Sequence, residues 1–178
     1  IMIGLPLLIA PAYWLAGRIG VLVLLSLLVW LATNTLSRLL HRYHAAPLTI
    51  GGILFCALSY PLVIYSQQIF PETVAFAIVA FVLYHTLRPE QPTSPRLHAL
   101  TVGGALAFLP HLHYKLTLTA AMLSLFFLWK NRHHWQTTLR WSLPPLLLSG
   151  ILFVAWIYTL FGTLSPQVFV APIGGTFL

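Results

Sequence analysis

The sequence predicts an all-α fold, a polytopic transmembrane bundle of about six helices preceded by a broken or interfacial helix. Of its 178 residues 59% are hydrophobic and only 6% are charged, and the mean hydropathy is +0.89. A soluble domain of this size cannot bury so many apolar side chains. The Lys and Arg residues also fall mostly in short clusters between apolar runs, as they do in membrane proteins. We therefore expect a single transmembrane domain over residues 1–178.

The first element, residues 1–17, is apolar but contains two glycines and two prolines. Its run of about 15 residues, closed by Arg18, is shorter than the roughly 20 residues that cross a bilayer. Tyr13 and Trp14 are residue types that favour the boundary between membrane and water. This stretch is therefore predicted to be a broken or interfacial helix.

Six apolar stretches of helical length follow, separated by basic residues, prolines and polar residues. Their predicted ranges are about 19–37, 48–66, 72–87, 97–110, 115–129 and 143–161. Both ends of the chain lie in abrupt apolar or Gly-rich sequence, so we expect it to be an internal fragment of a longer membrane protein.

The distribution of basic residues predicts the orientation of these spans. If the spans alternate in direction, the connectors 38–47, 88–96 and 130–142 share one side and hold seven of the nine Lys and Arg residues. Short cytoplasmic loops accumulate such residues, so these connectors are predicted to be cytoplasmic. The protein is then a multi-pass integral membrane protein, of the plasma or inner membrane if it is bacterial. Its net charge of +7 reflects topology, so membrane lipids are expected partners and nucleic acid is not.

Glu72 is the first candidate for a functional site. It is one of only two acidic residues, and it lies directly after Pro71, where apolar sequence resumes. A carboxylate between hydrophobic segments is costly, which in a membrane protein makes it a functional-site hypothesis by default. Glu72 could accept a hydrogen bond from a sugar hydroxyl, help to bind a metal or pair with Lys115. The alternative is that it caps a helix at the membrane interface.

Basic residues on the predicted non-cytoplasmic side form a second set of candidates. His111, His113 and Lys115 would make a positive pocket suited to a phosphate or pyrophosphate group, and Arg18 could join them. The alternative is that the first three anchor helix ends and that Arg18 extends along the membrane surface.

Polar residues before Glu72 complete the set. Tyr65, Gln67 and Gln68 could hydrogen-bond a polar substrate or could satisfy a helix end. The spacing of Cys and His residues indicates no metal site, so no cofactor is assigned, and a divalent metal ion stays open as an alternative. No Gly-rich phosphate loop or nucleophile elbow is present, so soluble-enzyme chemistry is unsupported.

A series of short motifs resembles the multi-spanning membrane glycosyltransferases of the GT-C class, which use polyprenyl-phosphate sugars. The resemblance depends on the order and spacing of these motifs, since each is weak alone. They are Gly-Leu-Pro-Leu-Leu at 4–8, Pro-Ala-Tyr at 11–13, Gly-Arg-Ile-Gly at 17–20, Ser-Tyr-Pro at 59–61, Ile-Phe-Pro-Glu at 69–72, Phe-Leu-Pro-His-Leu-His-Tyr-Lys at 108–115 and Phe-Gly-Thr-Leu-Ser-Pro at 161–166.

The resemblance implies transfer of a sugar from a polyprenyl-phosphate carrier to an acceptor on the non-cytoplasmic face. It also implies that the principal catalytic acid lies in an external loop upstream of residue 1, so that this chain alone has no identified catalytic residue. By position, Glu72, His113 and Lys115 match substrate-site residues of that class. The alternative function is a non-enzymatic membrane component or a transporter of lipid-linked or small polar substrates.

Overall fold

The computed structural model describes residues 3–43, 49–52, 69–88 and 94–161. The described part is all-helical and contains no strand, which confirms the all-α part of the predicted fold class. Residues 49–52 are also helical. The main helices are α1 (Gly4–Leu40), α4 (Pro71–Leu87), α5 (Pro95–Leu112), α6 (Leu116–Lys130) and α7 (Trp135–Phe161), with a 3-10 turn, η1 (Arg132–His134), before α7.

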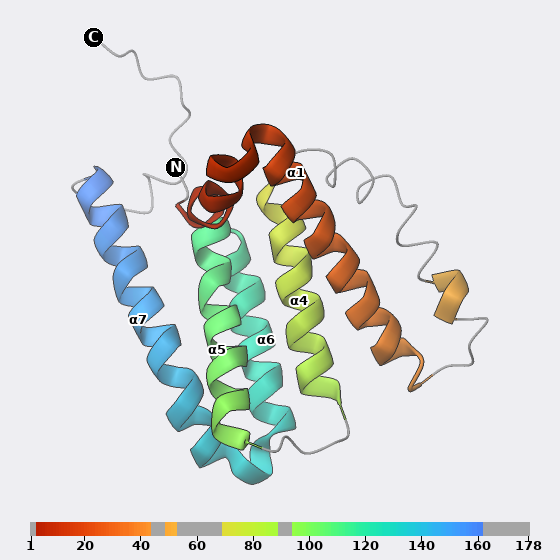
Figure 1. Ribbon diagram of the computed structural model, residues 1–178. Helices are drawn as coiled ribbons and strands as arrows, with labels where there is room; N and C mark the ends of the chain where they lie inside the picture. The colour runs from red at the N-terminus through yellow and green to blue at the C-terminus, as the bar shows by residue number, and fades with distance from the viewer. Residues whose placement is uncertain (1–2, 44–48, 53–68, 89–93, 162–178) are drawn as a thin grey trace.

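The helices form a bundle in which α1 packs on α4, α4 on α5, and α5 on α7, with α6 against α5 and α4 (Figure 1). In Figure 1, α4 and α6 run in one direction, and α5 and α7 run in the opposite direction. The buried core joins α1, α4, α5 and α6 through aliphatic side chains and one phenylalanine. It includes Val21, Leu25, Val74, Val82, Val102, Leu106, Leu109 and Phe127.

Helix α1 is broken near its first third. Ala16 and Gly17 have non-helical backbone angles, and Gly17 has a φ of 57° and a ψ of −145°. The first limb, residues 4–15, folds over the end of α5, and the second limb, residues 18–40, descends beside α4 (Figure 1). A Cβ atom on Gly4 would lie 2.7 Å from the backbone of His111, which shows how closely the first limb lies on α5.

The second limb of α1 runs parallel to α4. At its end, the hydroxyl of Tyr43 donates a hydrogen bond to the carbonyl oxygen of Leu87, the last residue of α4, at 2.8 Å. Ile69, by contrast, lies just before the first turn of α4. Tyr43 and Ile69 therefore lie at opposite ends of the bundle.

Two helical stretches are long and apolar enough to cross a membrane by length and composition, namely α1 and residues 132–159. α4 and α6 are apolar but shorter, with 17 and 15 residues. A bundle of six spans is therefore not confirmed. The predicted span 48–66 lies almost wholly outside the described residues.

Helix bounds differ most from the predicted spans in α7. It begins at Trp135, eight residues before the expected start at 143, and it contains Pro144 and Pro145. The prediction followed the apolar run, whereas the helix continues through the polar residues before it, because backbone hydrogen bonding does not require apolar side chains. α5 and α7 meet most extensively of all pairs, and Gly103 lets them approach closely beside Ser142.

Candidate functional site

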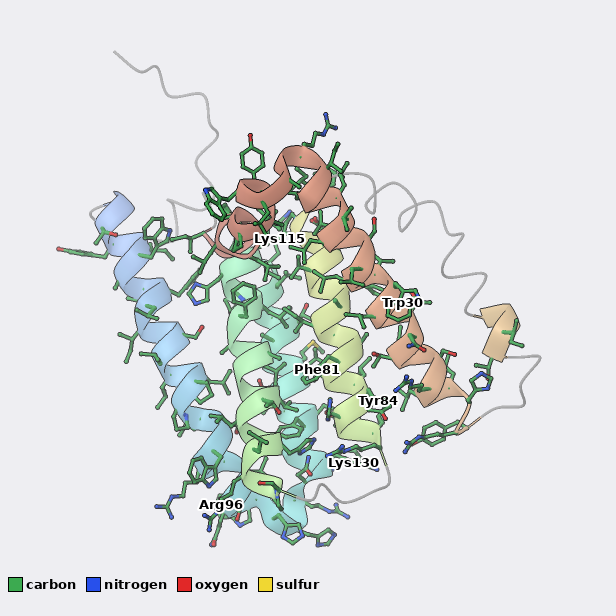
Figure 2. The ribbon with its side chains drawn as sticks, viewed as in Figure 1. Trp30, Phe81, Tyr84, Arg96, Lys115 and Lys130 are labelled. Carbon is green, nitrogen blue, oxygen red and sulfur yellow. The ribbon has the colours of Figure 1, made fainter. Side chains whose placement is uncertain are left out.

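The packing of α4 against α5 defines two ends of the bundle. The ring nitrogen Nε2 of His98, in the first turns of α5, lies 3.1 Å from the carbonyl oxygen of His85, in the last turn of α4. The two helices are therefore antiparallel, and the start of α4 lies at the same end as the last turn of α5. We call this end, where Glu72, His113 and Lys115 lie, the Lys115 end, and we call the opposite end the Arg96 end (Figure 2).

Glu72 is exposed at the first turn of α4, directly after Pro71 at the start of the helix. Its carboxylate lies at the N-terminal end of α4, which is the positive end of the helix dipole. Within the described residues it forms no ion pair with Lys115. Glu72 is therefore accessible to a ligand from the end of the bundle.

His113 and Lys115 occupy the short turn between α5 and α6. The Nδ1 atom of His113 accepts a hydrogen bond from the backbone N–H of Lys115 at 3.2 Å, so the neutral ring carries its proton on Nε2. The ring also stacks on Tyr114, with 4.8 Å between the centroids. These contacts orient His113, while the Lys115 side chain is exposed. The turn thus offers two hydrogen-bond donors of the kind that bind phosphate.

His111 contacts α7 through its ring. Its Nε2 atom lies 2.8 Å from the hydroxyl oxygen of Ser149 on α7, and its ring meets Phe153 edge-on at 5.6 Å. The Ser149 hydroxyl donates its proton to the carbonyl oxygen of Ala107, so its oxygen accepts the proton on His111 Nε2. His111 therefore links α5 to α7 through its Nε2 atom.

Arg18 is exposed and comes directly after the break in α1. Glu72, His113, Lys115 and Arg18 thus lie at the same end of the bundle (Figure 1), and among them a contact joins His113 to Lys115. Tyr65, Gln67 and Gln68 lie outside the described residues. Within the described ranges, no group of three or more His, Cys, Asp or Glu side chains is placed to hold a metal ion.

An apolar cavity of about 470 Å³ lies between α1, α4 and α5. Leu8, Val74 and Phe108 line the part near the Lys115 end, and Leu31, Thr35 and Phe81 line the part farther along the helices. The cavity therefore extends from the Lys115 end along the apolar body of the bundle.

A cluster of side chains at the Arg96 end was not predicted from the sequence. His85, Arg88 and His98 line a cavity of about 340 Å³ where α4 ends and α5 begins. A signal was present in the sequence, because two histidines that flank a short connector at the ends of antiparallel helices come close together. The contact itself could not be predicted from the sequence, because it depends on which faces of α4 and α5 meet.

Comparison of the chain with family models, with curated proteins and with solved structures finds no match.

Proposed function

We propose that this chain is part of an integral membrane glycosyltransferase, which moves a sugar from a lipid-phosphate carrier to an acceptor on the non-cytoplasmic face. The observation that carries the proposal is the set of polar side chains at the Lys115 end. There the side chains of Glu72, Lys115 and Arg18 are exposed at one end of the apolar body of the bundle. The imidazole of His113 is oriented beside Lys115. The resemblance to the GT-C class supplies the reaction type.

The exposed surface of the helices supports placement in a membrane. The most apolar 18-residue windows of the two long helical stretches have only 17% and 11% of their residues buried, unlike the core helices of a soluble protein. Large apolar side chains face outward, including Trp14 at 84%, Leu118 at 70% and Ile151 at 66% exposure. Contact with lipid tails is favourable for such an apolar surface, whereas contact with water is not.

The opposite placement of Tyr43 and Ile69 supports the alternation of spans on which the orientation depends. A span at 48–66 requires the chain to leave α1 at the Arg96 end and to enter α4 at the Lys115 end, which is where these two residues lie. In this orientation the Lys115 end faces the non-cytoplasmic side.

The Lys115 end has the groups that a lipid-phosphate sugar donor needs. The Lys115 ammonium and the Nε2–H of His113 can donate hydrogen bonds to the phosphate oxygens, and the Glu72 carboxylate can accept one from a sugar hydroxyl. The apolar cavity between α1, α4 and α5 begins near this end and suits an isoprenoid chain.

The reaction is an inverting displacement. The acceptor oxygen forms a bond to the anomeric carbon while the bond from that carbon to the phosphate oxygen breaks, and a carboxylate takes the acceptor proton. Lys115 and His113 stabilise the negative charge that develops on the leaving phosphate. Glu72 serves as a substrate-binding acid, and the resemblance places the principal base elsewhere in the intact protein.

Transfer from a labelled polyprenyl-phosphate sugar, measured with the intact protein in membranes, tests this proposal. Lys115→Ala and Glu72→Gln should each lower turnover about tenfold, because each removes a charge-assisted hydrogen bond to substrate. Lys130→Ala, which removes the same charge at the Arg96 end, is the matched control and should leave turnover unchanged.

Unchanged turnover in both Lys115→Ala and Glu72→Gln would remove the Lys115 end from the reaction. Absence of transfer by the wild type, together with uptake of a lipid-linked or polar solute into proteoliposomes, would favour the transporter function instead.

A further inference from the structure

We propose that the Arg96 end contains a second site, a pocket that binds a phosphate group between His85 of α4, Arg88 directly after α4 and His98 of α5. This site lies at the opposite end of the bundle from Lys115, so it is separate from the substrate site proposed above. The phosphate could belong to an anionic lipid headgroup or could be free phosphate.

The two imidazole rings of the pocket are held in place by their neighbours. His98 is only 8% exposed, and its Nε2–H donates to the carbonyl oxygen of His85 at 3.1 Å. The rings of His98 and His85 lie 5.5 Å apart, and the ring of His85 lies 4.3 Å from that of Phe81. The ring of Phe127, on α6, packs against that of His98, with 5.5 Å between the ring centroids. The pocket is therefore built from ordered side chains.

Two nitrogen atoms at this pocket have no partner among the described residues. His85 Nδ1 and Arg88 Nε are both shielded from solvent, and neither makes a hydrogen bond there. Buried polar atoms are nearly always paired, because leaving one unpaired costs about 1–3 kcal/mol. Arg88 Nε can only donate, so the missing partner must be an acceptor.

The cavity beside these atoms is large enough for such an acceptor. It has a volume of about 340 Å³, several times the roughly 30 Å³ that one water occupies in the liquid. Hydroxyl groups from the start of α5 complete its polar wall. The lining includes Phe81, His85, Arg88, Ser94, His98 and Thr101.

The charge at the pocket selects an anion over a metal cation. The Arg88 guanidinium is always charged, and no carboxylate is found among the described residues that line the cavity. The first turn of α5, which begins at Pro95, adds the positive end of a helix dipole. An oxyanion with several acceptor oxygens, such as phosphate, can satisfy His85 and Arg88 together.

Arg88 differs from two other arginines at this end. Arg42 lies over the ring of Tyr84 at 5.7 Å, and Arg96 lies over the ring of Trp141 at 5.9 Å. Arg88 instead lines the cavity with an unpaired Nε. In a membrane the Arg96 end would lie at the level of the lipid headgroups, where phosphate groups are abundant.

Retention of lipid by the intact purified protein tests the pocket. Native mass spectrometry in detergent would count bound phosphatidylglycerol against phosphatidylcholine, and a parallel arm would measure thermal stabilisation by inorganic phosphate. Arg88→Gln should retain at least fivefold less phosphatidylglycerol than the wild type. Arg132→Gln removes the same charge from an exposed position at the same end and should retain nearly the wild-type amount.

The two arms distinguish the sources of phosphate. Loss of phosphatidylglycerol retention in Arg88→Gln alone identifies a lipid headgroup. Stabilisation by inorganic phosphate that Arg88→Gln abolishes, without any preference for phosphatidylglycerol, identifies free phosphate. If Arg88→Gln does not fold, Arg88→Lys keeps the charge but lacks Nε, and at least threefold weaker retention is expected. Equal losses in the position-88 and position-132 variants, or no phosphate effect in either arm, would overturn the proposal.

Discussion

At the scale of single residues, His111 was a candidate phosphate ligand, and in the structure its Nε2 atom links α5 to α7. Its Nε2–H donates to Ser149, whose own proton is committed to Ala107, so the chain of hydrogen bonds has one direction. That direction leaves His111 Nε2 no capacity for a phosphate. His113 and Lys115, two and four residues further on, keep that capacity because they lie in the turn after α5.

Ser149→Ala should destabilise the protein by about 1 kcal/mol, because the His111 donor loses its acceptor in a half-buried setting. Thermal unfolding of the detergent-purified protein measures this. Ser124→Ala is the matched control, since the Ser124 hydroxyl bonds only to the carbonyl oxygen of Ala120 one turn earlier in its own helix. Equal midpoints for the two variants would show that the His111 contact contributes nothing.

Gly103→Ala should destabilise the protein by about 1–3 kcal/mol, because the added methyl group must push α7 away from α5. An ideal Cβ at this position would lie 2.7 Å from Ser142 Cα, whereas one on Gly104 would meet nothing within 4 Å. Gly104→Ala should therefore be neutral or stabilising, since alanine favours helix. The same unfolding measurement compares the pair, and a Gly103→Ala protein as stable as Gly104→Ala would contradict the close α5 and α7 contact.

At the scale of elements, the break in α1 decides what covers the Lys115 end. The first limb crosses α5 at Gly4 and His111, and Leu8 contributes to the apolar cavity. A straight helix over the same residues would carry Leu8 beyond the bundle, at about 1.5 Å of rise per residue. The reversal at Gly17 is therefore what places the first limb beside the proposed substrate site.

Gly17→Ala should destabilise the protein by about 1–3 kcal/mol, because a φ of 57° with a ψ of −145° is a conformation that side chains with a Cβ rarely adopt. No atom lies within 4 Å of the added Cβ, so the effect isolates the backbone. Gly150→Ala, also in open space but within regular helix, is the control for thermal unfolding. Indistinguishable stabilities would mean that the break does not depend on glycine.

At the scale of the whole molecule, the bundle separates its charges into two ends with different local structure. At the Arg96 end, Arg42 and Arg96 lie over aromatic rings, and Arg88 lines the cavity at His98. The Lys115 end instead presents Glu72 and Lys115 unpaired with each other in the described part of the chain. The apolar cavity between α1, α4 and α5 extends between these ends.

Labelling of single cysteines tests the proposed orientation. In a Cys56→Ser background, Lys115→Cys should react with a membrane-impermeant maleimide added to intact cells, and Lys130→Cys should react only after permeabilisation. The reason is that the two positions lie at opposite ends of α6. Equal reactivity from outside would contradict the orientation, and the reverse pattern would invert it.

The sequence by itself determined that the chain is helical and apolar, because these properties depend on composition and on local periodicity. It also placed Glu72 beside the start of α4 and Lys115 beside the start of α6, since proline and polar breaks mark helix ends. It did not determine the extent of α7, because helices continue beyond the apolar residues that reveal them.

Only the tertiary structure decided which side chains meet. The pairing of His111 with Ser149, the approach of Gly103 to Ser142 and the pocket of His85, Arg88 and His98 all join residues on different helices. Such contacts depend on the rotation and crossing of packed helices, which are set by the shapes of whole helix faces. The residues of one helix do not by themselves set its rotation and crossing against a neighbour. These contacts could therefore be identified only once the helices were packed together.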